Sequence, residues 1–189
     1  MEKQKILLIS CGHFEKEVLD CLVQDIEHEF GFSVSYKECC LEMSGYYHPS
    51  RRQYNANDIL KATAEASEAG FVKTIGLFRV DLFIPILTYI FGQAFLGGDT
   101  AIVSLFRLRN ELYGLEPNRN LMIERFRKVV LHELGHSFGL IHCLNPVCIM
   151  RSSTYVEDID QKKNVFCSAC HDQLIKNSNR PLDVKKSPC

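Results

Sequence analysis

The first 80 residues alternate between two hydrophobic periodicities. Residues 5–10 form a short, almost continuous apolar run, which predicts a buried strand. Between residues 15 and 30 the apolar side chains recur at helical spacing, and Gly31 supplies a stop signal after them. Apolar residues then alternate with small or polar ones from Phe32 to Tyr36, which is typical of a second strand.

The same order then repeats. Asn57 or Asp58 is a suitable N-cap for a helix that reaches Ala69, and Gly70 would end it. Residues 72–80 are the third predicted strand. Strands that alternate with helices in this way predict a right-handed, largely parallel sheet covered by helices.

Residues 82–98 carry no charge, but they do not predict a membrane span. Pro85 and Gly92 interrupt the run, Gly97 and Gly98 end it, and it is shorter than a typical span. We expect a buried loop that runs into a strand. The predicted strands at residues 90–96 and 100–108 are separated by three residues, so antiparallel neighbours are expected.

A long helix is predicted next, capped by Asn118 or Asn120, with apolar residues along its inner face at Met122, Phe126, Val130 and Leu134. The periodicity is lost after Gly139. The length of 189 residues fits one domain. We therefore predict a single α/β domain with a twisted mixed sheet. Its N-terminal subdomain would span 1–139, and a small irregular C-terminal subdomain at 140–189 would be stabilised more by bound metal than by a hydrophobic core.

The end of that helix carries the strongest chemical signal. His132 and His136 are four residues apart, so both lie on one helical face about 6 Å apart along the axis and can reach one metal ion. Glu133 lies beside them, where a carboxylate can accept a proton from a metal-bound water. Gly139 can adopt a positive φ and turn the chain so that His142 approaches the same ion. Three imidazoles, one base and an open fourth position are typical of a catalytic zinc site.

A different third ligand is conceivable. Some zinc peptidases use a carboxylate further along the chain, and Glu157 or Asp158 could serve here. The spacing from Gly139 to His142 favours the histidine, since it also explains the glycine.

Nine cysteines are present, and four of them have metal-like spacing: Cys143, Cys148, Cys167 and Cys170. Four thiolates would make a closed, structural zinc site. A pair of disulfides is the alternative, but no signal-peptide pattern follows Met1, so a reducing, cytoplasmic location is expected. The other cysteines lack such spacing and are expected to be free thiols: Cys11, Cys21, Cys39, Cys40 and Cys189.

The motif HExxHxxGxxH, followed by Cys143, Cys148, Met150 and the Cys167–Cys170 pair, resembles the archaemetzincin family of the metzincin zinc peptidases. The resemblance covers residues 131–170. It implies a metzincin-like zincin fold with two zinc ions, one catalytic and one structural, and makes Met150 the methionine packed beneath the zinc histidines. Some metzincins have a tyrosine two residues beyond that methionine; here Ser152 stands there and Tyr155 follows later, so a tyrosine ligand is not implied.

The resemblance also implies where substrate would bind. In metzincins the strand at the upper rim of the cleft pairs with an extended peptide, and Gln93, Ala94 and Phe95 stand where that strand is expected. An internal strand without a ligand role is the alternative.

The expected function is therefore zinc-dependent hydrolysis of a peptide or protein by a monomer, with Glu133 as general base. The alternative is an idle member of the same fold that binds peptides. The net charge is −1, and residues 151–189 hold seven Lys or Arg against five Asp or Glu, so no nucleic-acid partner is expected. Neither is a membrane partner.

Overall fold

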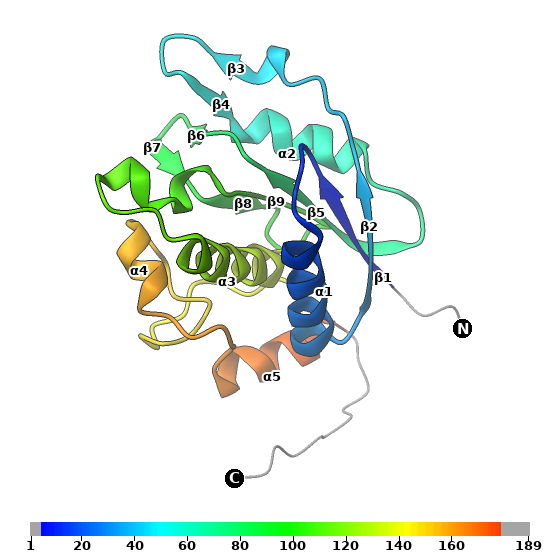
Figure 1. The fold of residues 1–189 in the computed structure, drawn as a ribbon. Coiled ribbons are helices and arrows are strands. Elements are labelled where there is room, and N and C mark those ends of the chain that lie inside the picture. The colour runs from blue at the N-terminus through cyan, green and yellow to red at the C-terminus, as the bar shows by residue number, and fades with distance from the viewer. Residues whose placement is uncertain (1–4, 179–189) are drawn as a thin grey trace.

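The computed structural model describes residues 5–178 and is built on a five-stranded sheet in the order β2-β1-β5-β9-β8 (Figure 1). Its strands are β1 (Lys5–Ser10), β2 (Ser33–Glu38), β5 (Phe71–Phe78), β9 (Thr100–Ser104) and β8 (Gly92–Ala94). The first four are parallel, and β8 pairs antiparallel with β9 at the edge. The predicted mixed α/β fold is confirmed, and so is the antiparallel pair.

Helices cover both faces of this sheet. On one face α1 (Lys16–Phe30) and α3 (Arg119–Ser137) pack on side chains of β1, β5 and β9, including Ile6, Ile75 and Val103. On the other face α2 (Ala56–Glu65) packs on Phe78 and Ile102. The period-2 alternation of β9 therefore serves two cores at once, which keeps the sheet in one register.

The helix ends test the capping predictions. Asn118 caps α3, because its side chain accepts the N–H of Leu121 at 3.0 Å. Asn57 and Asp58 were the wrong choices for α2, since Asn55 accepts the N–H of Asn57 at 3.1 Å and the helix starts one residue later. The helix also stops before Ala69: Ala66 is its C-cap, and the next residue, Ser67, bonds to Thr74 on β5.

A second sheet, in the order β3-β4-β6-β7, lies at the upper left of Figure 1, and the sequence did not predict it. Its strands are short: β3 (Tyr47–His48), β4 (Gln53–Asn55), β6 (Leu82–Ile84) and β7 (Leu87–Ile90). Buried Asp81 joins it to the chain beyond β9, accepting from Gln53 at 3.2 Å and from Arg107 at 2.7 Å. The expectation of a buried loop at 82–98 was wrong, because the segment forms strands and exposes Ile86.

Short elements complete the chain. The strand predicted at 100–108 ends at Ser104, whose hydroxyl donates to Val80 O and accepts the N–H of Phe106. Two 3-10 helices follow, Phe106–Leu108 and Asn110–Tyr113, and a third precedes β3 at Ser44–Tyr46. The region past Gly139 is less irregular than expected, since it holds α4 (Val156–Asp160) and α5 (Ser168–Asn177). No helix within residues 5–178 is long and apolar enough to span a membrane.

Candidate active site and metal clusters

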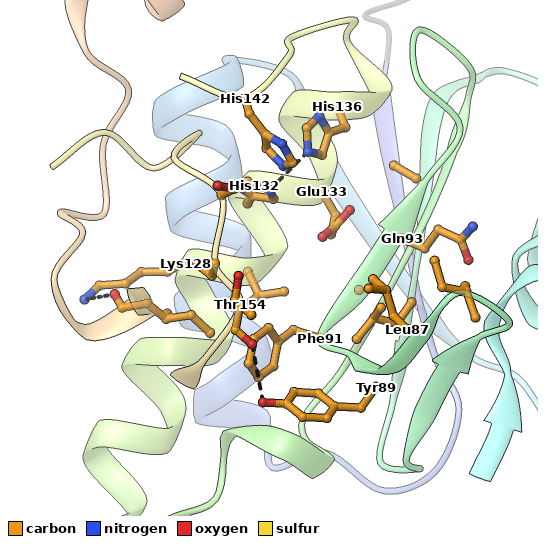
Figure 2. A pocket seen from close by; sticks show the side chains of 18 of the residues that line it. Leu87, Tyr89, Phe91, Gln93, Lys128, His132, Glu133, His136, His142 and Thr154 are labelled. Atoms are coloured by element: carbon orange, nitrogen blue, oxygen red, sulfur yellow. Dashed lines mark hydrogen bonds between the residues drawn. The ribbon is translucent and has the colours of Figure 1, made fainter. Parts of the chain in front are cut away.

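The last turns of α3 present two histidines to a cavity (Figure 2). His132 and His136 are on one face of the helix, and their Nε2 atoms lie 3.0 Å apart. Each ring is held by its other nitrogen: Nδ1 of His132 lies 2.8 Å from Ile149 O, and Nδ1 of His136 lies 2.7 Å from Leu140 O. A carbonyl oxygen only accepts, so both Nδ1 atoms carry the proton and both Nε2 lone pairs point at the same space.

The third histidine reaches that space through a turn. Gly139 has a φ of 83°, in the left-handed region that glycine adopts without strain. Its N–H donates to His136 O, and Leu140 N–H donates to Gly135 O, which ends the helix as predicted. One ligand atom from each of His132, His136 and His142 lies within 4.8 Å of the others, the spacing that one metal ion requires.

Burial keeps these imidazoles neutral. It lowers the pKa of all three, most strongly that of His132, and the charge of nearby Lys162 lowers them further. Neutral imidazole is the form that binds a metal ion.

Glu133 points into the same cavity from the neighbouring helix position, as Figure 2 shows. Burial raises the pKa of its carboxyl to about 8, against the opposing charge of Lys162. Its side chain lies directly against the edge strand: a Cβ on Gly92 would come 2.6 Å from Glu133 Cγ and 2.7 Å from Ile102 O. Only glycine at position 92 leaves room for this carboxylate.

Met150 lies beneath the histidine-bearing helix, where the resemblance implied. It is fully buried, and its sulfur fills the space that a Cβ on Gly135 would enter, at 2.5 Å. The preceding carbonyl, Ile149 O, is the one that orients His132. The methionine turn therefore supports the histidines through packing and through one main-chain hydrogen bond.

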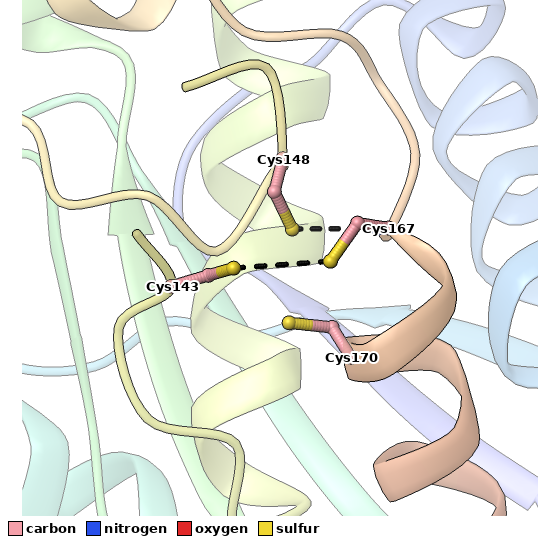
Figure 3. Close-up of side chains that lie close together, drawn as sticks. All are labelled: Cys143, Cys148, Cys167 and Cys170. Carbon is pink, nitrogen blue, oxygen red and sulfur yellow. Dashed lines mark hydrogen bonds between the residues drawn. The ribbon is translucent and has the colours of Figure 1, made fainter. Parts of the chain in front are cut away.

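The four predicted cysteines converge in the C-terminal region (Figure 3). Their sulfurs lie within 4.8 Å of one another, with Cys143 and Cys167 3.8 Å apart. None of the cysteines that the structure describes is in a disulfide, and Cys189 lies outside the described residues. Backbone N–H groups point at two sulfurs, from Asn145 to Cys143 and from Cys167 to Cys148, both at 3.4 Å. Such donors stabilise thiolates, which suits a metal site.

The two clusters are joined by one peptide bond. Cys143 follows His142 directly, and its N–H donates to Met150 O at 2.9 Å. In the cysteine cluster, backbone hydrogen bonding lowers the pKa of Cys167 to about 7, while burial raises that of Cys148. The thiolate is the form of cysteine that binds metal, so the lowered pKa of Cys167 suits a metal site.

The cavity runs from the histidines along the edge strand and has a volume of about 550 Å³. Gln93 and Ala94 belong to β8 and line it, whereas Phe95 follows the end of the strand and does not. Phe91 O and Phe95 N both bond to β9, so by alternation the N–H and C=O of Ala94 point to the free edge. The strand is an edge strand, as the substrate prediction requires.

Several groups at the cavity have no signal in the sequence. Lys162 and Ser153 line it, and Tyr89 donates to Thr154 O at 3.3 Å across one end, as Figure 2 shows. Glu157 and Asp158, the alternative third ligands, do not lie in the histidine cluster. Asp158 accepts the N–H groups of Thr154 and Tyr155 at the start of α4.

Comparisons with known proteins agree with this geometry. Residues 44–176 match the model of peptidase family M54. The chain is 35% identical over 178 residues to an archaemetzincin of Thermococcus kodakarensis, covering 91% of this chain and 96% of that one. It is 34% identical over 170 residues to one of Methanocaldococcus jannaschii, covering 90% and 92%.

Solved structures match as well. An archaemetzincin from Methanopyrus kandleri has a TM-score of 0.82 at 31% identity, covering 94% of this chain and 96% of that one. A zinc-dependent peptidase from Methanocorpusculum labreanum has a TM-score of 0.80 at 28% identity, covering 89% and 99%. Fold and site together thus define a zinc metallopeptidase. The chain belongs to peptidase family M54, the archaemetzincins.

Proposed function

We propose that this chain hydrolyses peptide bonds at the histidine cluster, with His132, His136 and His142 as zinc ligands and Glu133 as general base. The observation that carries the proposal is the 3.0 Å approach of two Nε2 atoms that both lack a proton. Two lone pairs at that distance repel one another, and a cation between them removes the repulsion. The donor set therefore fits a zinc ion, with three neutral imidazoles and an open side toward the cavity.

Zinc, when bound there, supplies a Lewis acid that polarises a carbonyl and lowers the pKa of water. The chain's own contribution is the carboxylate of Glu133. Its pKa of about 8 belongs to the metal-free chain, and a divalent cation beside it favours the ionised form. Glu133 then accepts a proton from the attacking water and returns it to the leaving amine. Its carboxylate can lie against the edge strand because Gly92 has no side chain.

The edge strand is the proposed peptide-binding element. The outward N–H and C=O of Ala94 can pair with an extended backbone, which needs only a free edge. The cysteine cluster is proposed to hold a second, structural zinc, giving two ions per chain. Its place next to His142 makes it a support for the third ligand. We further propose that the active form is a monomer with a peptide or protein substrate.

Digestion of a peptide library by the zinc-loaded protein, read by mass spectrometry, tests the function. The parent should cleave, and Glu133→Ala should lose at least ~10²-fold activity while it keeps its fold and zinc content. An idle peptide-binding member of the fold would bind library peptides without cleaving any. Activity of Glu133→Ala within a few-fold of the parent would remove Glu133 from its role.

A further inference from the structure

Lys162 is a buried cation that forms no ion pair within 4.0 Å among the described residues, although Glu133 and Asp158 act on its charge from further away. Its side chain is 6% exposed and lines the cavity of the histidine cluster. Its ammonium has one hydrogen bond, a long one of 3.4 Å to Ile149 O. Among residues 5–178, no carboxylate pairs with it within 4.0 Å. A lysine that is buried to this degree almost always has a partner.

The other buried cations show what is missing. Arg125 forms an ion pair with Asp160 at 2.6 Å, and Lys128 forms one with Glu124 at 2.8 Å. Each is 3% exposed. Lys128 lines the same cavity as Lys162, so of the two buried lysines in this cavity only Lys162 has no ion-pair partner among the described residues.

A second donor in the same cavity also lacks a partner. The hydroxyl of Ser153 is buried, and no hydrogen-bonding group among the described residues reaches it. A buried polar group without a partner costs free energy. The Ser153 hydroxyl and the Lys162 ammonium lie in one cavity, so the same kind of ligand could satisfy both. That ligand accepts hydrogen bonds and carries negative charge.

We propose that Lys162, with Ser153, binds a carboxylate of the substrate, so that the enzyme prefers peptides with an acidic side chain or a free α-carboxylate near the scissile bond. This rests on the proposed function, since the cavity is the one that holds Glu133. Lys162 also shares Ile149 O with the ring of His132, so the carboxylate would bind beside the metal ligands. A carboxylate and an ammonium form a charge-assisted hydrogen bond, which a carboxamide of the same shape cannot match.

The test compares peptides that differ only by a carboxylate and its amide. Asp against Asn and Glu against Gln are varied at each position near the bond, and a free C-terminus is compared with an amidated one. For either the acidic side chain or the free C-terminus, the parent should have a kcat/KM about 10- to 100-fold higher for the carboxylate peptide than for its amide. In Lys162→Met that ratio should fall to near 1, and Lys162→Arg should keep part of it.

Lys163→Met is the matched control, because it removes the same charge from the next residue, which is exposed. Its ratio should equal the parent's. A parental ratio near 1 overturns the proposal. The proposal is also overturned if the ratio falls as far in Lys163→Met as in Lys162→Met. It is overturned as well if Lys162→Met loses cysteine-bound zinc but keeps the preference for the carboxylate peptide. Should Lys162→Met not fold, Ser153→Ala and Lys162→Arg measure the same ratio.

Binding separates this proposal from the proposed function. Dissociation constants of the same peptide pairs are measured with Glu133→Gln, which keeps Lys162. If the zinc-loaded parent cleaves nothing, the proposed function fails, while tighter binding of the carboxylate member still supports the role of Lys162. If the parent cleaves but both members of each pair bind and react alike, only the role of Lys162 fails.

Discussion

The two clusters of candidate metal ligands lie next to each other but are built differently. Two of the three histidines lie on a buried 19-residue helix, and main-chain carbonyls fix their rings. Of the four cysteines, Cys143 and Cys148 lie in the chain outside the helices, Cys167 is the N-cap of α5, and Cys170 lies in its first turn. The histidine cluster faces a cavity, and the cysteine cluster does not line it. The fold thus holds the histidine cluster open to the cavity, whereas the proposed role of the cysteine cluster is to hold part of the fold together.

Breaking the cysteine cluster should have the largest effect. Structural zinc is worth on the order of 10 kcal/mol of folding energy in small zinc domains. Cys167→Ser should disorder the segment after His142 and loosen that histidine, so activity and both metals are lost. Circular dichroism and metal analysis measure this. Cys21→Ser, outside the cluster, should change neither, and a Cys167→Ser protein with full activity contradicts the structural role.

Stepwise chelation should separate the clusters in the order of their accessibility. A chelator can enter the cavity of the histidines, while four thiolates hold zinc more strongly and enclose it. Mild chelation should leave a folded, inactive protein with one zinc. Metal analysis with circular dichroism on the same samples checks the order. Loss of both ions together with unfolding contradicts it, as does finding one zinc per chain in fully loaded protein.

Displacing the Glu133 carboxylate without changing a proposed zinc ligand should show how strongly kcat depends on its position. Gly92→Ala adds a Cβ 2.6 Å from Glu133 Cγ, so the carboxylate must shift. Misplacement of a catalytic group commonly costs on the order of 10²-fold in rate, and we expect that loss in kcat with zinc content unchanged. Gly45→Ala is the control, because nothing lies within 4 Å of its added Cβ. Equal kcat in both variants would contradict the contact.

The edge strand should give a smaller effect that appears in KM. Ala94→Pro removes the outward N–H, and a lost hydrogen bond should raise KM about 3- to 10-fold. Ala94→Ser keeps the N–H and serves as the control. Gln93→Pro is unsuitable, since that residue faces β9 in the ladder and its loss would damage the sheet. Parental KM for a folded Ala94→Pro protein would mean that peptides bind elsewhere.

The smallest effect concerns stability without metal. The folded pKa of Glu133 is about 8, above its unfolded value, so its stability contribution is full at pH below about 4.5 and is lost as the pH rises through 8. At pH 7 the neutral Glu133→Gln should therefore stabilise the zinc-free protein, by on the order of 2 kcal/mol. Thermal unfolding at pH 7 and pH 4 measures it. A gain that is equal at both pH values contradicts burial of the charge.

The sequence predicted those features of the fold that depend on a few neighbouring residues. The cap at Asn118, the turn at Gly139 and the parallel strands around β1 all follow from residue type and spacing. The second sheet could not be predicted, because its strands have only two to four residues and depend on the buried Asp81 network. Lys162 was equally hidden, since a lysine in a charged stretch reads as exposed until the fold buries it.

The hydrogen bond from Cys143 N to Met150 O has a consequence for the order in which the enzyme matures. Two histidines are in position once the long helix packs on the sheet, but the third waits for the loop that Cys143 and Met150 close. That loop is anchored by cysteines up to 27 residues further along the chain, so its closure comes last. We therefore expect a newly made chain to gain its proposed hydrolytic centre only after its thiols have captured zinc, so that it does not cut its neighbours while it is still folding.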